Sequence, residues 1–162
     1  MDDLIQLEHW AGALLARLEP AARRRLTRAI ALDLRRRQQQ RIAAQRNPDG
    51  SPFAPRKRQA DPPRRKPGHG LRSKSGRVRK KAAAMFQRLR TARFLRPQSD
   101  AAQAAVGFAG RVARIARVHQ YGERDRVSPR GPVVQYPARR LLGLSAADIE
   151  HIRQTLLDHL RG

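Results

Sequence analysis

The segment at residues 51–76 restricts the fold of this chain more than any other feature of its sequence. It holds five prolines, and Phe53 is its only large apolar residue before Leu71. Such a segment buries too little apolar surface to offset the entropy that the chain loses on becoming ordered. The sequence therefore predicts a long flexible loop here, with the folded part of the protein built from the residues on either side.

Most of the positive charge lies in this loop and just after it. The chain of 162 residues has 36 Lys and Arg against 13 Asp and Glu, a formal net charge of +23. Residues 51–96 hold 16 basic residues and one acidic residue, a net of +15, whereas residues 1–50 and 97–162 each carry only +4. A charge of this size favours an anionic partner and carries no information about the fold. The basic residues that form a candidate assembly or DNA-facing surface are Arg56, Lys57, Arg58, Arg64, Arg65, Lys66, Arg72, Lys74, Arg77, Arg79, Lys80 and Lys81.

Three interpretations of this basic segment stay open on charge alone. The first is a solvated loop without a specific partner. The second is a surface that docks on a protein neighbour or lines a channel containing DNA. The third is a sequence-specific reader of nucleic acid. Attraction to phosphate needs only charge, so a basic run is non-specific evidence. A specific reader would show a helix-turn-helix, a zinc finger or an aromatic platform, and the sequence shows none. A basic protein that binds nucleic acid without sequence specificity remains the alternative function.

Two helices are predicted before the loop. Apolar residues at helical spacing form one stripe over residues 3–18 and a narrower one over residues 20–46. Pro20 separates the two helices, because the residue before a proline avoids the helical region and proline itself suits a first helical turn. The sequence Asn-Pro-Asp-Gly at residues 47–50 predicts a turn that ends the second helix.

Three more helices are predicted after the loop. Residues 77–91 and 111–121 show helical spacing, and Gly122 ends the second of these. The last helix has the clearest start, with Ser145 as its N-cap and Asp148 three residues later in a capping-box arrangement.

Short strands complete the predicted fold. Residues 94–95, 104–108 and 133–136 suggest strands, and residues 123–132 read as a polar loop. The fold class is therefore α+β: a small antiparallel sheet of about three strands packs against the long helix and the C-terminal helix. We expect one domain over residues 1–162, with the basic loop inside it.

The sequence offers little chemistry for catalysis. It contains no cysteine, which removes disulfides, thiolate metal ligands and a cysteine nucleophile. Its five histidines show no zinc-ligand spacing, and His119 suits a structural role at the end of a buried helix. No apolar run approaches the roughly 20 residues that cross a bilayer, and the N-terminus does not resemble an export signal. We expect a cytoplasmic protein that is no enzyme and has no cofactor, metal site or membrane partner.

Four stretches of the sequence, taken together, resemble the phage virion morphogenesis family. They are QRNPDGSPFAPRK at 45–57, GRVRKKAAAMFQRLRTARFL at 76–95, VGFAGRVARIARVHQYG at 106–122 and YPARRLLGLSAADIEHI at 136–152. The resemblance covers about residues 10–160, and it departs at Phe53, where many relatives have tryptophan. The positions that it marks as structural are Asn47, Pro48, Asp49, Gly50, Phe53, His119, Gln120, Gly122, Tyr136, Pro137, Arg139, Leu142 and Gly143.

The resemblance implies a structural role in finishing the tail of a contractile-tailed phage and joining it to the head. It implies a homo-oligomeric ring, expected to be a hexamer, at the head-proximal end of the tail. The implied partners are tail tube, sheath or head-connector proteins, with possible non-specific contact with phage DNA. The implied locations are the host bacterial cytoplasm during assembly and afterwards the tail or neck of the virion. In such a ring, residues 51–76 would be an arm that grips neighbouring copies or faces DNA in transit.

Overall fold

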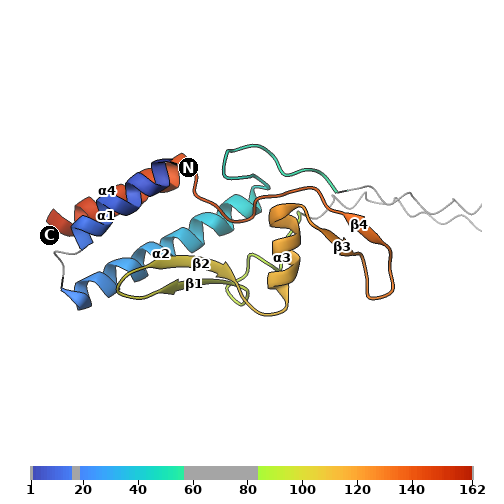
Figure 1. The fold of residues 1–162 in the computed structure, drawn as a ribbon, viewed down its shortest axis with the longest axis horizontal. Coiled ribbons are helices and arrows are strands. Elements are labelled where there is room, and N and C mark those ends of the chain that lie inside the picture. Colours follow the sequence, from blue (N-terminus) through green and yellow to red (C-terminus); the bar gives the residue numbers. More distant parts are fainter. Residues whose placement is uncertain (1, 16–18, 57–83, 162) are drawn as a thin grey trace, which may run out of the picture.

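The computed structural model describes residues 2–15, 19–56 and 84–161 of the chain. Within these ranges it contains four helices and four short strands (Figure 1). In chain order they are α1 (Asp2–Leu15), α2 (Pro20–Ala43), β1 (Leu95–Ser99), β2 (Ala104–Phe108), α3 (Val112–Tyr121), β3 (Arg124–Arg126), β4 (Val133–Gln135) and α4 (Ala146–Arg161). The α+β class predicted from the sequence is confirmed.

The helices α1, α2 and α4 form a layer with its own apolar core. Helices α1 and α4 lie side by side on one side of α2, while the β1–β2 hairpin lies on its other side (Figure 1). Along α2, buried apolar residues recur every four positions, so that one stripe faces its neighbours. The core of this layer consists of Leu7, Leu26, Ile30, Leu34, Ile152 and Leu156.

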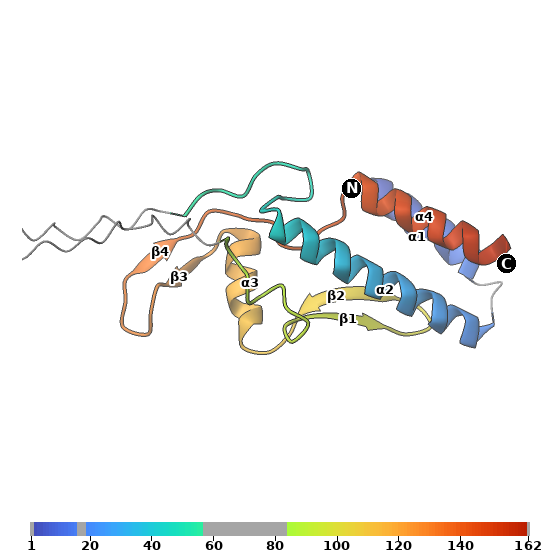
Figure 2. The ribbon, with the colours of Figure 1, turned by 180° about the vertical axis from the view of Figure 1, so that it is seen from behind.

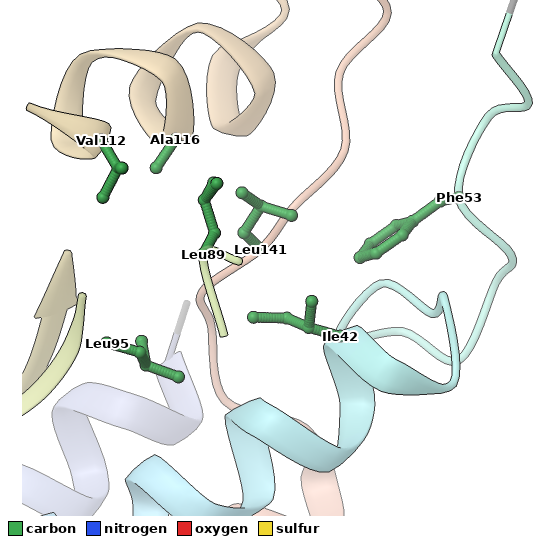
Figure 3. Packing of buried hydrophobic residues seen from close by; sticks show 7 residues of the cluster. All are labelled: Ile42, Phe53, Leu89, Leu95, Val112, Ala116 and Leu141. Carbon is green, nitrogen blue, oxygen red and sulfur yellow. The ribbon is translucent and has the colours of Figure 1, made fainter. Parts of the chain in front are cut away.

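The β1–β2 hairpin is antiparallel and connects this layer to the rest of the molecule. Leu95 lies opposite Phe108 and Ser99 lies opposite Ala104. Behind the hairpin a second apolar core draws on α2, β1, α3 and three irregular segments (Figure 3). Its buried members are Ile42, Phe53, Leu89, Leu95, Val112, Ala116 and Leu141.

Helix α3 and the β3–β4 hairpin lie at the end of the described structure that is opposite to helices α1 and α4 (Figure 1). Helix α3 crosses the end of the β1–β2 hairpin, and β3–β4 projects beyond it (Figure 2). Gly122 ends α3 in the left-handed conformation, with φ of 69°, as the sequence predicted. Antiparallel pairing then joins Arg124 to Gln135 and Arg126 to Val133.

The predicted sheet of about three strands is wrong in its strand count. The described residues form two separate sheets of two strands each, because α3 lies between the β1–β2 hairpin and β4 in the chain and in space. The polar loop predicted at residues 123–132 is also wrong in part. Residues 124–126 form β3, and the N–H of Val127 donates to the carbonyl of Pro132 at 3.2 Å to close the hairpin.

The helix predicted at residues 77–91 does not form in its described part. Residues 85–90 make turns, and Phe86 has a positive φ of 64°. The side chain of Gln45 accounts for this, since its amide donates to the Met85 carbonyl at 3.0 Å and accepts from the Met85 N–H at 2.8 Å. A tertiary contact thus takes the backbone groups that a helix would use.

The other predicted boundaries differ by a few residues. The second helix ends at Ala43 instead of residue 46, since Gln45 has a φ of 59°, outside the helical region. Residues 16–18 of the first predicted helix, residues 77–83 of the third and residues 57–76 of the predicted loop lie outside the described residues. No helix among the described residues is both long enough and apolar enough to span a bilayer.

Candidate assembly surface

The turn at residues 47–50 lies directly before the basic segment. The N–H of Gly50 donates to the Asn47 carbonyl at 3.0 Å, and Gly50 has a φ of 83°, which glycine adopts without strain. The carboxylate of Asp49 accepts the hydroxyl of Ser51 at 2.5 Å and its N–H at 2.9 Å. These bonds lower the pKa of Asp49. The side-chain oxygen Oδ1 of Asn47 accepts a hydrogen bond from the backbone N–H of Arg140 at 2.9 Å. This bond ties the turn to the C-terminal part of the chain.

A buried arginine holds the first residues of the basic segment. The guanidinium of Arg139 donates from Nε to the carbonyl of Ala54 at 2.7 Å and from Nη2 to the carbonyl of Pro55 at 3.0 Å. Its Nη1 lies 3.0 Å from Nδ1 of His119. Only 3% of Arg139 is exposed, and its rigid fork of donors fits this arrangement of acceptors. Arg139 therefore fixes the backbone that leads into the segment.

Aromatic rings extend the site across residues far apart in the sequence. The centroid of Phe86 lies 5.8 Å from that of Phe53 and 4.9 Å from that of His119, and His119 lies 5.0 Å from Tyr136. Each pair meets edge to face, which is a favourable geometry. Burial, followed by the positive charges of Arg139 and Arg56, lowers the pKa of His119 to about 4. The imidazole is therefore neutral near pH 7 and accepts a hydrogen bond from Arg139.

The chain returns from the basic segment next to the place where it entered. Phe53 lies near the start of the segment and Phe86 follows its end, yet their rings are in contact. Gln45 holds the backbone of Met85 through both of its amide groups. Folded residues thus clamp the segment at both ends.

A third set of contacts joins α3 to the extended chain before α4. The side chain of Gln120 donates to the carbonyl of Leu142 at 3.0 Å and accepts its N–H at 2.9 Å. A Cβ on Gly122 would lie 2.9 Å from the backbone N of Ala138, and one on Gly143 would lie 2.7 Å from Pro48. Only glycine fits these close approaches. We call residues 45–56, 84–86, 119–122 and 136–143 together the root of the basic segment.

The structure brings together the positions marked by the family resemblance and leaves most of the basic residues undescribed. All thirteen of those positions, from Asn47 to Gly143, belong to the root. Of the twelve basic residues in the candidate surface, the structure describes only Arg56, which is exposed and is the last residue of the root before position 57. The other eleven, from Lys57 to Lys81, lie outside the described residues.

Two residues of the site escaped prediction from the sequence. Gln38 is 3% exposed and donates to the carbonyl of Gly143 at 2.8 Å. Arg41 donates to the carbonyls of Arg140 and Leu141 at 2.9 Å and 3.0 Å. The position of Gln38 along α2 was a usable signal of its burial, because it falls four residues after Leu34 on the buried stripe.

The chemistry of the root is that of holding a chain in place. Its arginine and amide donors are directed at carbonyl groups of the same molecule, and the neutral His119 already accepts a bond from Arg139. In the described ranges no group of three or more His, Cys, Asp or Glu side chains is placed to hold a metal ion. The geometry therefore suits the anchoring of the chain at residues 54–55 and 85, before and after the undescribed range.

The comparisons with known proteins agree with this picture of a structural protein. Residues 2–161 match the phage virion morphogenesis family, and the chain belongs to that family. It is similar to Tail completion protein S of Escherichia phage P2, with 38% identity over 161 residues that cover 99% of each chain. No solved structure matches the chain significantly.

Proposed function

We propose that this protein completes the tail of a phage and prepares it for joining to the head, as a structural component of the virion. The observation that carries the proposal is the similarity to Tail completion protein S over 99% of both chains. Membership of the virion morphogenesis family supports it, because that family is structural. The root adds physical support, since its polar groups organise the chain itself.

Deletion of the gene from the phage or prophage that carries it tests this role. We expect the lysate to contain filled heads and tails that remain separate under the electron microscope, and few infectious particles. A plasmid that supplies the intact gene restores joined particles and serves as the control. Normal numbers of joined, infectious particles without the gene would contradict the proposal.

We further propose that the protein acts as a ring of identical subunits at the head-proximal end of the tail, in which the basic segment of each copy contacts the next. The clamped ends support this arrangement. Arg139 holds Ala54 and Pro55, and Gln45 holds Met85, so a force on the segment passes into the folded body. A head-to-tail contact of this kind repeats around a ring until it closes.

Two variants separate the length of the segment from its charge. In the first, a short glycine-serine linker replaces residues 57–83, which keeps the carbonyls that Arg139 binds. In the second, glutamine replaces the eleven basic residues between Lys57 and Lys81, which keeps the length. We expect both to fold with unchanged circular dichroism and to sediment as monomers, while the natural chain forms rings. Rings of normal size from both variants would rule out an arm in this segment.

The net charge of +23 favours one other function, the binding of nucleic acid without sequence specificity. In that case the isolated monomer binds duplex DNA tightly at about 0.15 M salt, and the affinity falls steeply as salt rises. Tight binding of this kind, together with normal head joining after deletion of the gene, would replace the tail role by this one.

A further inference from the structure

The outer edge of strand β2 has no partner among the described residues. Bonds from Ala109 to Phe94 at 2.8 Å and from Asp100 to Gln103 at 3.0 Å fix the alternation of the β1–β2 ladder. In that alternation the N–H and C=O groups of Ala105 and Gly107 face β1, and those of residues 104, 106 and 108 point away from it. Within the described ranges these outward groups make no hydrogen bond with the protein.

The outer edge of β1 is protected, by contrast. Pro97 has no N–H to offer at a position where the backbone points away from β2. The carbonyl of Leu95 accepts a bond from Nε of Arg35 at 3.0 Å, and the carbonyl of Asp100 just beyond the strand accepts the Thr27 hydroxyl at 2.6 Å. Proteins normally close strand edges with such devices, because an open edge pairs with other chains. One edge of this hairpin is closed and the other is available.

An apolar groove lies beside the open edge. Three adjoining hollows share Leu142: one is lined by Phe108 and Tyr121, the next by Pro48 and Leu144, and the third by Val106. Helix α2 contributes to the third hollow, and the chain at residues 142–144 forms a wall facing β2. An added strand would thus find backbone partners along β2 and apolar side chains on both sides.

The charged residues that line this groove are all arginines. Arg114 and Arg117 line the hollow beside α3, and Arg140 lines the next one. No acidic residue lines any of the three hollows in the described part of the chain. Arg114 and Arg117 form ion pairs with Asp125 and Glu123. Arg140 forms no close ion pair among the described residues, although its charge helps to lower the pKa of Asp49. The groove therefore favours a ligand with negative charge.

We propose that the free edge of β2 is a docking site for an extended strand of another protein, in which apolar side chains alternate with acidic ones. Main-chain bonds to residues 104, 106 and 108 would supply affinity, and the groove would select alternate apolar side chains. The β2 edge of another copy fits less well, because its sequence Ala-Ala-Val-Gly-Phe brings no acidic side chain to the arginines of the groove. This inference goes beyond the proposed function, since strand addition requires neither the basic segment nor a ring.

A synthetic octapeptide that alternates valine with glutamate serves as the probe, and its counterpart with lysine in place of glutamate is the matched control. Titration calorimetry with the full-length chain measures both. We expect the glutamate peptide to bind at least tenfold more tightly than the lysine peptide. Equal binding of the two peptides, or no binding of either, overturns the proposal.

Two substitutions at Val106 distinguish the contribution of the backbone edge to peptide binding from that of the side chain. Val106→Pro removes an outward N–H and places a ring in the path of the added strand, whereas Val106→Ala trims the side chain and keeps the N–H. We expect Val106→Pro to weaken binding of the glutamate peptide at least tenfold and Val106→Ala to change it by less than threefold. Equal affinities for the two variants, both folded by circular dichroism, overturn strand addition.

Hydrogen exchange on the unaltered protein gives a test that does not depend on the folding of a variant. The amides of Ala105 and Gly107 are protected with or without peptide, because they already pair with β1. We expect the amides of residues 104, 106 and 108 to exchange quickly in the free protein and to become at least tenfold slower with the glutamate peptide. Slow exchange of these amides in the free protein at high concentration, together with dimers in sedimentation, would identify a second copy as the occupant and overturn the proposed one.

Discussion

The helical layer and the root of the basic segment are held together in different ways. In the layer of α1, α2 and α4, a cluster of aliphatic side chains forms the core, and its packing supplies the stabilisation. In the root, arginine, glutamine and asparagine side chains bind backbone carbonyls and N–H groups that lie 22 to 93 residues away in the sequence. The layer therefore resists unfolding as a whole, whereas the root fixes the position of particular segments.

This difference follows from what each region has to do. Aliphatic packing is non-directional, so it stabilises a layer without defining where a loop leaves it. Hydrogen bonds are directional, and Arg139 can place Ala54 and Pro55 only in one geometry. A segment whose two ends are held at fixed places needs the second kind of contact.

The largest effect is expected from Leu156→Ala, which breaks the packing of the helical layer. Leu156 is 2% exposed and belongs to the core between α2 and α4. Its truncation should lower the free energy of unfolding by about 2–5 kcal/mol, from lost burial and the cavity left behind. Urea unfolding followed by circular dichroism measures this loss. Leu32→Ala is the control, because Leu32 is 40% exposed on α2, and an equal loss in both variants would contradict the role of the core.

A smaller loss of global stability but a larger local change is expected from Arg139→Met. The substitution keeps a long, unbranched side chain but leaves the carbonyls of Ala54 and Pro55 without their donor. This loss should lower the free energy of unfolding by about 1.5–3 kcal/mol. Arg139→Lys should not rescue the protein, because an ammonium group cannot reproduce the planar fork. Limited proteolysis should cut near residues 53–56 faster in both variants than in Leu156→Ala at matched stability. Equal cutting rates would show that Arg139 contributes only to general stability.

The root should also give the protein a dependence on pH through His119. The pKa of His119 is about 4 in the folded protein against an ordinary value of 6.5, so between these values the unfolded chain binds a proton that the folded chain does not. The free energy of unfolding should therefore fall as pH decreases from 6.5 toward 4, and this contribution of His119 is fully present above pH 6.5. Urea unfolding at several pH values measures the slope. His119→Gln, which keeps an acceptor for Arg139, should reduce it, and parallel profiles for the two proteins would contradict this prediction.

The sequence predicted the elements whose signals are local. Pro20 marked the start of α2, Gly122 the end of α3 and Ser145 the start of α4, because each acts through its own backbone or its neighbours. The alternation at residues 104–108 likewise predicted β2. Such signals need no knowledge of the tertiary structure.

The errors occurred where distant residues decide the structure. Residues 85–90 have helical spacing, but Gln45 binds the backbone of Met85 from 40 positions away. Strand β3 reads Arg-Asp-Arg, a composition that strands rarely have, and it forms because β4 pairs with it. The place of Gln38 on the stripe of α2 indicated its burial, but its bond to Gly143 was unpredictable, since no pattern within either segment reveals the other.

The smallest effect is expected from Ser145→Ala, which removes a directional contact of the root's kind from the helical layer. The hydroxyl of Ser145 accepts the N–H of Asp148 at 3.2 Å, while the Asp148 carboxylate accepts the N–H of Ser145 at 2.9 Å. Loss of this cap should lower the free energy of unfolding by about 1 kcal/mol, since water can reach the start of the helix and replace part of the bond. Ser145→Thr keeps the hydroxyl and should remain close to the natural protein in urea unfolding. A loss from Ser145→Ala as large as that from Leu156→Ala would mean that caps stabilise the layer as much as packing does.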